Sequence, residues 1–197
     1  MDRQISFGQY RIIDNVLFGI ILAISETVII TAAGKWFPGQ LYTVSVSAAI
    51  VSIVMMRWGI WSAIHAALAG IIYVAVQGGS AEQLFIYVIG NEFALAALLL
   101  IKFAGRDRIR KNVLLTLSYA LVVQLLMQTG RGVAAMITGA GAGAILNFIT
   151  MDALSELFTM LIVFTASRLD GVFEDQKTYL LGLQKEKDFQ NGEHENG

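Results

Sequence analysis

The residues of this chain that are best able to do chemistry are charged and amide side chains set within long apolar stretches. Gln124, Gln128 and Arg131 are spaced i, i+4 and i+7, which places them on one face of a helix. Asp152 and Glu156 are one turn apart and also share a face. Such groups can bind a small polar ligand, carry ions, or pair with one another as a structural network.

The sequence lacks the signatures of an enzyme or a nucleotide site. Gly139, Gly141 and Gly143 alternate with alanine, but the lysine of a phosphate-binding loop is missing. Ala142 stands where a G-x-S-x-G turn would carry its nucleophile. There is no HExxH motif, and the absence of cysteine excludes thiol chemistry. We therefore expect no catalytic residues, no metal site and no cofactor.

Composition indicates an integral membrane protein. Hydrophobic residues make up 56% of the 197-residue chain and charged residues only 15%, whereas a soluble domain carries about 25% charged residues. The net charge of −1 gives no general attraction to nucleic acid. We expect the lipid bilayer, and no nucleic acid, as a partner.

The apolar stretches predict an all-α fold with six transmembrane helices. A helix needs ~20 apolar residues to cross the hydrocarbon core, and backbone groups in lipid must be satisfied within the helix. The predicted spans are Ile12–Ala33, Leu41–Met56, Gly59–Val76, Gln83–Phe103, Val113–Ile137 and Met151–Ser167. Residues 1–170 would form one substrate-binding membrane domain, and residues 171–197 a cytoplasmic tail that is partly helical and then disordered.

Basic residues predict the orientation. Of the 14 lysines and arginines, all but Lys35 and Arg131 fall at the starts or ends of the spans that share one side. The positive-inside rule places this side in the cytoplasm, together with both termini.

With this orientation, the polar residues converge in the outer half of the bundle. Intramembrane ionisable groups are costly, so each is a candidate for function. Aromatic residues gather at the same level, as in a pocket for a small heterocycle. We predict that substrate is bound by Glu26, Trp36, Tyr42, Asn91, Glu92, Gln128, Arg131, Asn147, Asp152 and Glu156. The alternative is an internal ion-pair network in which Arg131 pairs with Glu26, Asp152 or Glu156.

Two outer loops would cover this pocket. The loop at residues 34–40 contains Pro38, the only proline, which stiffens its turn. The loop at residues 138–150 carries the glycine–alanine run, whose small side chains are typical of a mobile connection. We interpret the second loop as a movable cover rather than a passive connector.

The size and layout resemble the substrate-binding (S) component of energy-coupling-factor (ECF) transporters, which import vitamins into bacteria. The resemblance covers about Ile12 to Asp170. That family tends to carry Ala-x-x-x-Ala on its first helix; here the matching residues read Gly19-Ile-Ile-Leu-Ala23, and a second small-xxx-small pair is Ala63 and Ala67.

The resemblance implies a partner interface at Gly19, Ala23, Ala63 and Ala67. It further implies a vitamin or vitamin precursor as ligand, a coupling transmembrane subunit, two cytoplasmic ATPases, and location in the bacterial plasma membrane. The surplus of carboxylates predicts a cationic or donor-rich heterocycle, held by stacking and by Glu92 or Glu156.

Two other classes stay open. A stand-alone secondary transporter or channel would use Glu92 and His65 to relay ions, although His65, set among alanines, is more typical of a packing residue. The sequence shows neither the broken helices nor the duplication that such carriers often have. An intramembrane enzyme would need a catalytic constellation that the sequence lacks.

Overall fold

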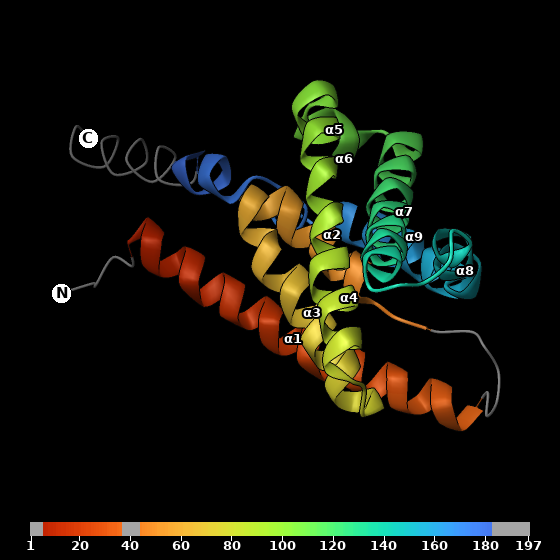
Figure 1. Cartoon of the computed structure of the whole chain (residues 1–197). Helices are drawn as coiled ribbons and strands as arrows, with labels where there is room; N and C mark the ends of the chain where they lie inside the picture. Colours follow the sequence, from red (N-terminus) through yellow and green to blue (C-terminus); the bar gives the residue numbers. More distant parts are fainter. Residues whose placement is uncertain (1–5, 37–43, 183–197) are drawn as a thin grey trace, which may run out of the picture.

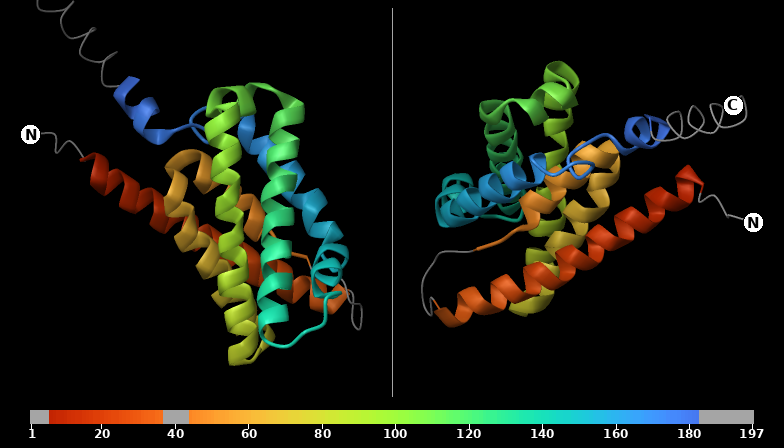
Figure 2. Two further views of the ribbon diagram at one scale, coloured as in Figure 1. Left: turned by 45° about the horizontal axis from the view of Figure 1, so that its top comes forward. Right: turned by 180° about the vertical axis from the view of Figure 1, so that it is seen from behind.

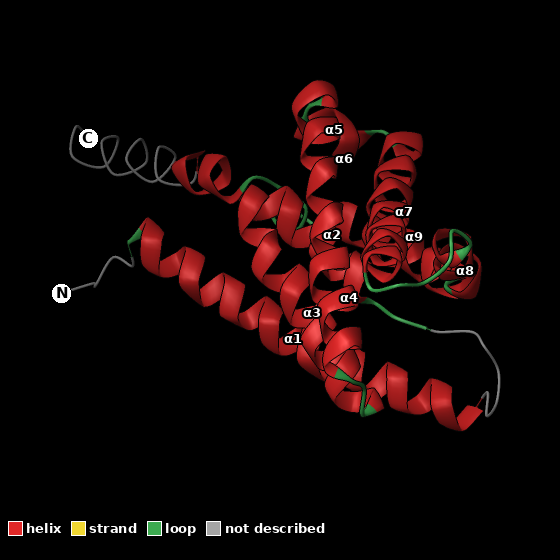
Figure 3. Cartoon of the chain, in the orientation of Figure 1, coloured by secondary structure: helices red, strands yellow, loops and turns green. Residues whose placement is uncertain are grey.

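The computed structural model describes residues 6–36 and 44–182, and every regular element within these ranges is a helix (Figures 1 and 3). This confirms the all-α prediction. In chain order the elements are α1 (Phe7–Trp36), α2 (Ser47–Trp58), η1 (Gly59–Trp61), α3 (Ser62–Gln77), α4 (Ala81–Asn91), η2 (Glu92–Ala96), α5 (Ala97–Ala104), α6 (Arg106–Lys111), α7 (Val113–Ile137), α8 (Ala144–Met151) and α9 (Ala153–Ser167).

Several of these helices are long and apolar enough to cross a membrane. The described residues contain four such helical stretches, which are Phe7–Trp36, Ser47–Gln77, Ala81–Ala104 and Val113–Ile137. A fifth is reached if α8 and α9, which are bent by 56° relative to each other, count as one span. The chain therefore has the helices of a polytopic membrane protein, and six separate crossings stay a prediction.

The number of candidate spans is below six partly because two predicted spans, Leu41–Met56 and Gly59–Val76, fall on the single stretch Ser47–Gln77. Within this stretch, α2 and α3 are the two arms of a short hairpin. The chain turns at Gly59, whose φ of 60° is readily adopted by glycine. Ile50 and Val54 of α2 then pack in one cluster with Ala69 of α3, and Figure 2 shows the two arms side by side. The predicted span Leu41–Met56 begins at residues 41–43, which lie outside the described residues.

Helix α2 forms the centre of the bundle. All 12 of its residues are buried, as expected for a helix that is apolar on every side. At ~1.5 Å per residue it is only ~18 Å long, which is short of the ~30 Å hydrocarbon core. The side chains of α2 therefore contact neighbouring helices rather than lipid.

Helices α3, α4 and α7 approach one another closely at glycine residues. A Cβ at Gly70 of α3 would lie 2.7 Å from the carbonyl carbon of Tyr87, and one at Gly90 of α4 would lie 2.5 Å from the Cα of Arg131. A Cβ at Gly130 of α7 would collide with the carbonyl oxygen of Gly90. Only glycine permits these backbone contacts, so these glycines fix how α4 crosses its neighbours.

Both ends of the described chain lie at the same end of the bundle (Figure 1). The Tyr10 hydroxyl donates to Oε1 of Gln176 at 3.3 Å. Phe173, which follows α9, is fully buried and packs edge-to-face on Tyr119, with ring centroids 6.1 Å apart. The segment just after the predicted boundary at residue 170 is therefore packed into the bundle, while residues 183–197 of the predicted tail lie outside the described range.

Candidate functional site

A network of buried polar side chains joins α4, α7 and α9 in the half of the bundle that is remote from the chain ends. We call it the Arg131 cluster. It contains Asn91 of α4, three residues of α7, the residue between α8 and α9, and two residues of α9; in order, these are Asn91, Gln124, Gln128, Arg131, Asp152, Ser155 and Thr159. All seven are buried.

Arg131 lies at the centre of this cluster. Its Nε donates to Oδ1 of Asn91 at 2.7 Å, and its Nη1 donates to Oε1 of Gln128 at 3.2 Å. The same Nη1 lies 3.4 Å from Oδ2 of Asp152. Asn91 is held in turn, because its Nδ2 donates to the carbonyl oxygen of Ala66 at 2.9 Å. The guanidinium is thus bound mainly by neutral amides, with one carboxylate at longer range.

Asp152 lies at the break between α8 and α9. Its Oδ2 accepts from Nε2 of Gln124 at 3.0 Å and also from Nε2 of Gln128. Its Oδ1 accepts from the Ser155 hydroxyl at 2.5 Å. This 56° break corrects our expectation that the chain has no broken helix. No residue at this position indicates a break, because neither proline nor glycine is present there.

Glu26 of α1 lies beside the cluster and is fully buried. Its Oε2 accepts from the backbone N–H of Val46 at 2.9 Å, whereas Oε1 has no hydrogen-bond partner among the described residues. The Ser45 N–H just before α2 donates to the Ser155 hydroxyl at 2.8 Å. The start of α2 therefore connects Glu26 with α9.

Aromatic rings lie over Arg131 on the side of α8. The Tyr87 ring is 4.8 Å from the Arg131 guanidinium carbon and stacks on Tyr73 at 4.2 Å between centroids. Phe148 of α8 meets Tyr87 edge-on at 6.0 Å. A Cβ at Gly132 would lie 2.5 Å from the Cα of Ile145, so α8 also packs tightly on α7. Within the predicted cover, residues 144–150 thus form a helix over the aromatic layer.

The structure brings together some of the predicted site residues and not others. Asn91, Gln128, Arg131 and Asp152 are members of the cluster, and Glu26 is adjacent to it. Glu156 lies one turn along α9, with its Oε1 buried and unpartnered by any described residue. The remaining predicted residues with described positions, Glu92, Trp36 and Asn147, make no side-chain hydrogen bond or ion pair within the described chain; Trp36 and Asn147 are exposed. Tyr42 lies outside the described residues.

Some cluster residues are absent from the predicted substrate-binding set. Gln124 was placed on the face of Gln128 and Arg131 but was not included in that set. Ser155 and Thr159 carried no signal, because hydroxyl residues in membrane helices usually bond to their own backbone.

A second buried charge pair, at the chain-end side of the bundle, was also missed. Arg57 donates to both oxygens of Asp14 at 2.8 Å, and its Nη1 donates to the carbonyl oxygens of Gly171 and Val172 at 2.6 and 3.0 Å. The Trp58 indole donates to Oδ2 of Asp14 at 2.5 Å. The available signal was an aspartate inside the first apolar stretch, facing an arginine at a helix end.

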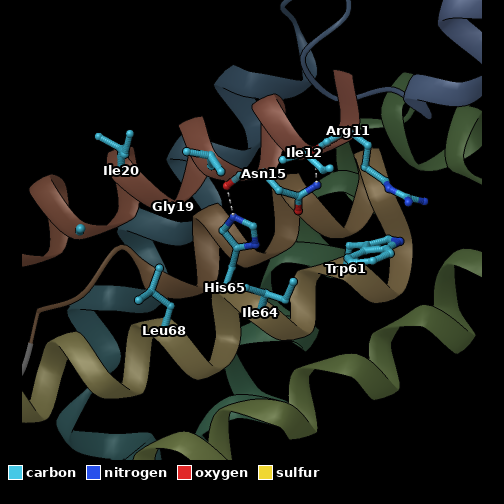
Figure 4. A pocket seen from close by; sticks show the side chains of 11 residues that line it. Arg11, Ile12, Asn15, Gly19, Ile20, Trp61, Ile64, His65 and Leu68 are labelled. Carbon is cyan, nitrogen blue, oxygen red and sulfur yellow. Dashed lines mark hydrogen bonds between the residues drawn. The ribbon is translucent and has the colours of Figure 1, made fainter. Parts of the chain in front are cut away.

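The predicted partner interface lies partly in a groove between α1 and α3. Figure 4 shows this groove, which has a volume of about 640 Å³ and is lined by Gly19 and Ala23. His65 also lines it, and its Nε2 donates to the carbonyl oxygen of Asn15 at 3.0 Å. Ala63 and Ala67 are partly buried on α3 and do not line the groove.

No group of three or more potential metal-ligating side chains occurs within residues 6–36 and 44–182. Comparison with protein-family models, with curated proteins and with solved structures found no match to this chain.

Proposed function

We propose that this chain is the membrane-embedded substrate-capture subunit of an ATP-driven micronutrient importer, in the manner of an ECF S component. The observation that carries the proposal is the Arg131 cluster, which gathers charged and amide groups from α4, α7 and the break between α8 and α9 inside an apolar bundle. In this proposal the basic end of the bundle faces the cytoplasm, and the cluster faces the exterior of a bacterial plasma membrane.

A purely structural network explains the cluster less well. Buried polar atoms in proteins are nearly always hydrogen-bonded. Oε1 of Glu26 and Oε1 of Glu156 lack partners among the described residues, although both are buried. Arg131 is the only basic side chain in the cluster, and Asp152 already lies within ion-pair distance of it. We propose that these carboxylate oxygens accept hydrogen bonds from a ligand.

These oxygens suggest a ligand that carries a positive charge or several hydrogen-bond donors on a heterocycle. Glu26 and Glu156 would bind the donors, in place of the Glu92 expected from the sequence. Helix α8 would cover the ligand, because the glycine run at residues 139–143 precedes it and the break at Asp152 follows it. Gly139, with φ of 109°, lies at the start of this connection.

Delivery of the ligand would require the coupling transmembrane subunit and the two cytoplasmic ATPases. We propose that the coupling subunit docks in the α1–α3 groove. A Cβ at Gly19 would meet only Leu68 Cδ2, at 3.6 Å, which is an ordinary van der Waals contact, so we expect the Gly19→Leu variant to fold. This variant should capture ligand normally and fail to assemble with the coupling subunit; retained assembly would contradict the interface.

The decisive experiment is mass spectrometry of small molecules that co-purify with the detergent-solubilised chain. Once the ligand is known, Glu26→Gln should weaken its binding at least tenfold, because the isosteric amide removes the charge. Glu92→Gln is the matched control and should bind ligand as the unmodified chain does. Equal affinity of the Glu26→Gln variant would exclude Glu26 from the site.

The broken helix supports a second candidate, an ion-coupled carrier that works alone. Carriers often place polar groups at the break of a discontinuous helix near the membrane midplane, and Asp152 occupies such a break. The relay would then involve Asp152, since no hydrogen bond among the described residues joins Glu92 to His65. Ligand uptake by the purified chain alone in proteoliposomes with an imposed ion gradient would favour this candidate over the importer subunit.

A further inference from the structure

We propose that Glu92 is the centre of an intramembrane docking surface for a partner protein's transmembrane helix that presents a basic side chain at the same depth. This proposal concerns the outward face of α4, η2 and α5. It does not rest on the importer function, because Glu92 is not a member of the Arg131 cluster and does not line the α1–α3 groove.

Glu92 lies at the depth where a charge is most costly. It is the twelfth residue of the 24-residue helical stretch Ala81–Ala104, so it lies ~16 Å from the start of that stretch at ~1.5 Å per residue. Because the hydrocarbon core is ~30 Å thick, the carboxyl group is close to the bilayer midplane when this stretch crosses the membrane.

Glu92 also lies at the edge of the face that points away from the bundle. The buried positions of this stretch form one stripe, comprising Ile86, Gly90, Asn91, Ala94, Ala97 and Ile101. Glu92–Ala96 is a 3₁₀ helix, and the exposed stripe runs through Phe93 and Ala96, directly beside Glu92. Phe85, Ile89 and Leu99 continue this stripe and are 40%, 43% and 59% exposed. The side chain of Glu92 itself is partly exposed.

The described residues offer Glu92 no hydrogen bond and no ion pair. Polar and ionisable residues within membrane helices almost always face the bundle interior or pair with another group, and the neighbouring Asn91 follows this rule. A partly exposed carboxyl group that is unpaired within the described chain at the midplane therefore indicates a partner in another molecule.

Charge complementarity identifies the partner's chemistry. A carboxylate accepts hydrogen bonds, and an arginine or lysine supplies donors and the opposite charge. A second copy of this chain fits less well, because a symmetric contact would bring two Glu92 carboxylates together. Ala96, on the exposed stripe beside Glu92, is small, which allows a helix to approach closely there.

The test uses the full chain in phosphatidylcholine vesicles and designed transmembrane leucine–alanine peptides. The peptides carry arginine, leucine or glutamate at their central position. Since the chain has no cysteine, Ala81→Cys provides a single site for a fluorescent donor, and each peptide carries the acceptor. Energy transfer as a function of the peptide-to-lipid ratio then gives the relative affinities.

We expect the arginine peptide to bind at least tenfold more tightly than the leucine peptide. Glu92→Gln should remove this preference, and Glu82→Gln, a control on the first turn of the same helix, should keep it. Ligand capture should be unchanged in both variants, which separates this test from that of the importer function.

Three outcomes would overturn the proposal. The first is equal affinity of the arginine and leucine peptides, and the second is a preference that survives Glu92→Gln. The third is tighter binding of the glutamate peptide, or Glu92-dependent energy transfer between two labelled copies of the chain, either of which would identify a carboxyl–carboxyl contact instead.

Discussion

Two buried arginines in one chain are held in contrasting ways. Arg57 makes a bidentate pair with Asp14, and its remaining bonds go to two backbone carbonyls. Arg131 is held by the amide oxygens of Asn91 and Gln128, and its nearest carboxylate oxygen is 3.4 Å away. Both side chains are about equally buried, at 6% and 5% exposed.

The difference separates a structural pair from a candidate site. Bidentate arginine–carboxylate pairs are among the strongest and most specific polar contacts, and the Arg57 pair ties α1, α2 and residues 171–172 together. Around Arg131, glutamines and hydroxyls surround a carboxylate at a helix break, and Glu26 keeps an unpartnered oxygen nearby. The Arg57 pair therefore leaves no role for a ligand, whereas the Arg131 cluster leaves one.

The largest expected effect is at the Arg57 pair. Asp14→Asn leaves a buried guanidinium without its counter-charge, and breaking a buried pair in this way costs about 3–5 kcal/mol. We expect the free energy of unfolding to fall by this amount, as measured by steric trapping in bicelles. Ligand affinity per folded molecule should stay unchanged.

A reciprocal double variant sharpens this prediction. Asp14→Leu with Arg57→Met removes both charges and keeps apolar volume, so it should recover much of the lost stability. If the double variant is as unstable as Asp14→Asn, the contacts of Arg57 with the Gly171 and Val172 carbonyls, rather than the charge pair, stabilise this end of the bundle.

The corresponding aspartate-to-asparagine substitution in the Arg131 cluster should lower the free energy of unfolding by less than Asp14→Asn does. Asp152→Asn keeps an oxygen that can accept from Gln124 and Gln128, and Arg131 retains its amide partners. The loss is then that of a charge-assisted contact, about 1.5–3 kcal/mol, measured in the same bicelles. Affinity for the co-purified ligand should fall at least tenfold.

This pair of variants tests the contrast directly. Equal destabilisation by Asp14→Asn and Asp152→Asn, with ligand affinity unchanged in both, would show that the Arg131 cluster is a second structural pair.

The contrast also shows what the sequence could and could not predict. Helical class, apolar stretches and the shared face of Gln128 and Arg131 follow from composition and helical periodicity, and the structure has them. Asp152 was predicted as a polar group of the last span, but its place at a helix break was not, since no residue there weakens a helix. Glu92 and Asn91 are neighbours in sequence, and only the structure shows that Asn91 is buried whereas Glu92 is partly exposed.

The close helix crossings were equally hidden. Gly90 and Gly130 are isolated glycines in two apolar stretches, and their contact depends on long-range packing. The conspicuous glycines at 139, 141 and 143 have open space instead. The glycine-rich run therefore drew the prediction to the loop, whereas the isolated glycines Gly90 and Gly130 determine how Arg131 is positioned.

Gly130→Ala tests how strongly that crossing supports the cluster. The added methyl would collide with the carbonyl oxygen of Gly90 and lie 2.6 Å from Phe93 Cβ, so α4 and α7 must move apart. Overpacking of this kind costs about 1–3 kcal/mol, and ligand affinity should fall as Asn91 moves away from Arg131. Gly141→Ala, which meets nothing within 4 Å, is the control and should change neither quantity.

The smallest expected effect is at the surface of the chain-end side. Arg106 pairs with Asp175 at 2.7 Å, and Arg110 pairs with Glu174, but all four side chains are between about a fifth and a third exposed. Exposed pairs contribute about 0–1 kcal/mol, so Arg106→Gln should lower the free energy of unfolding by less than about 1 kcal/mol. A larger loss would mean that residues 174–175 are held by these surface pairs. A small one would leave the buried Arg57 pair and Phe173 as the contacts that fix this segment to the bundle.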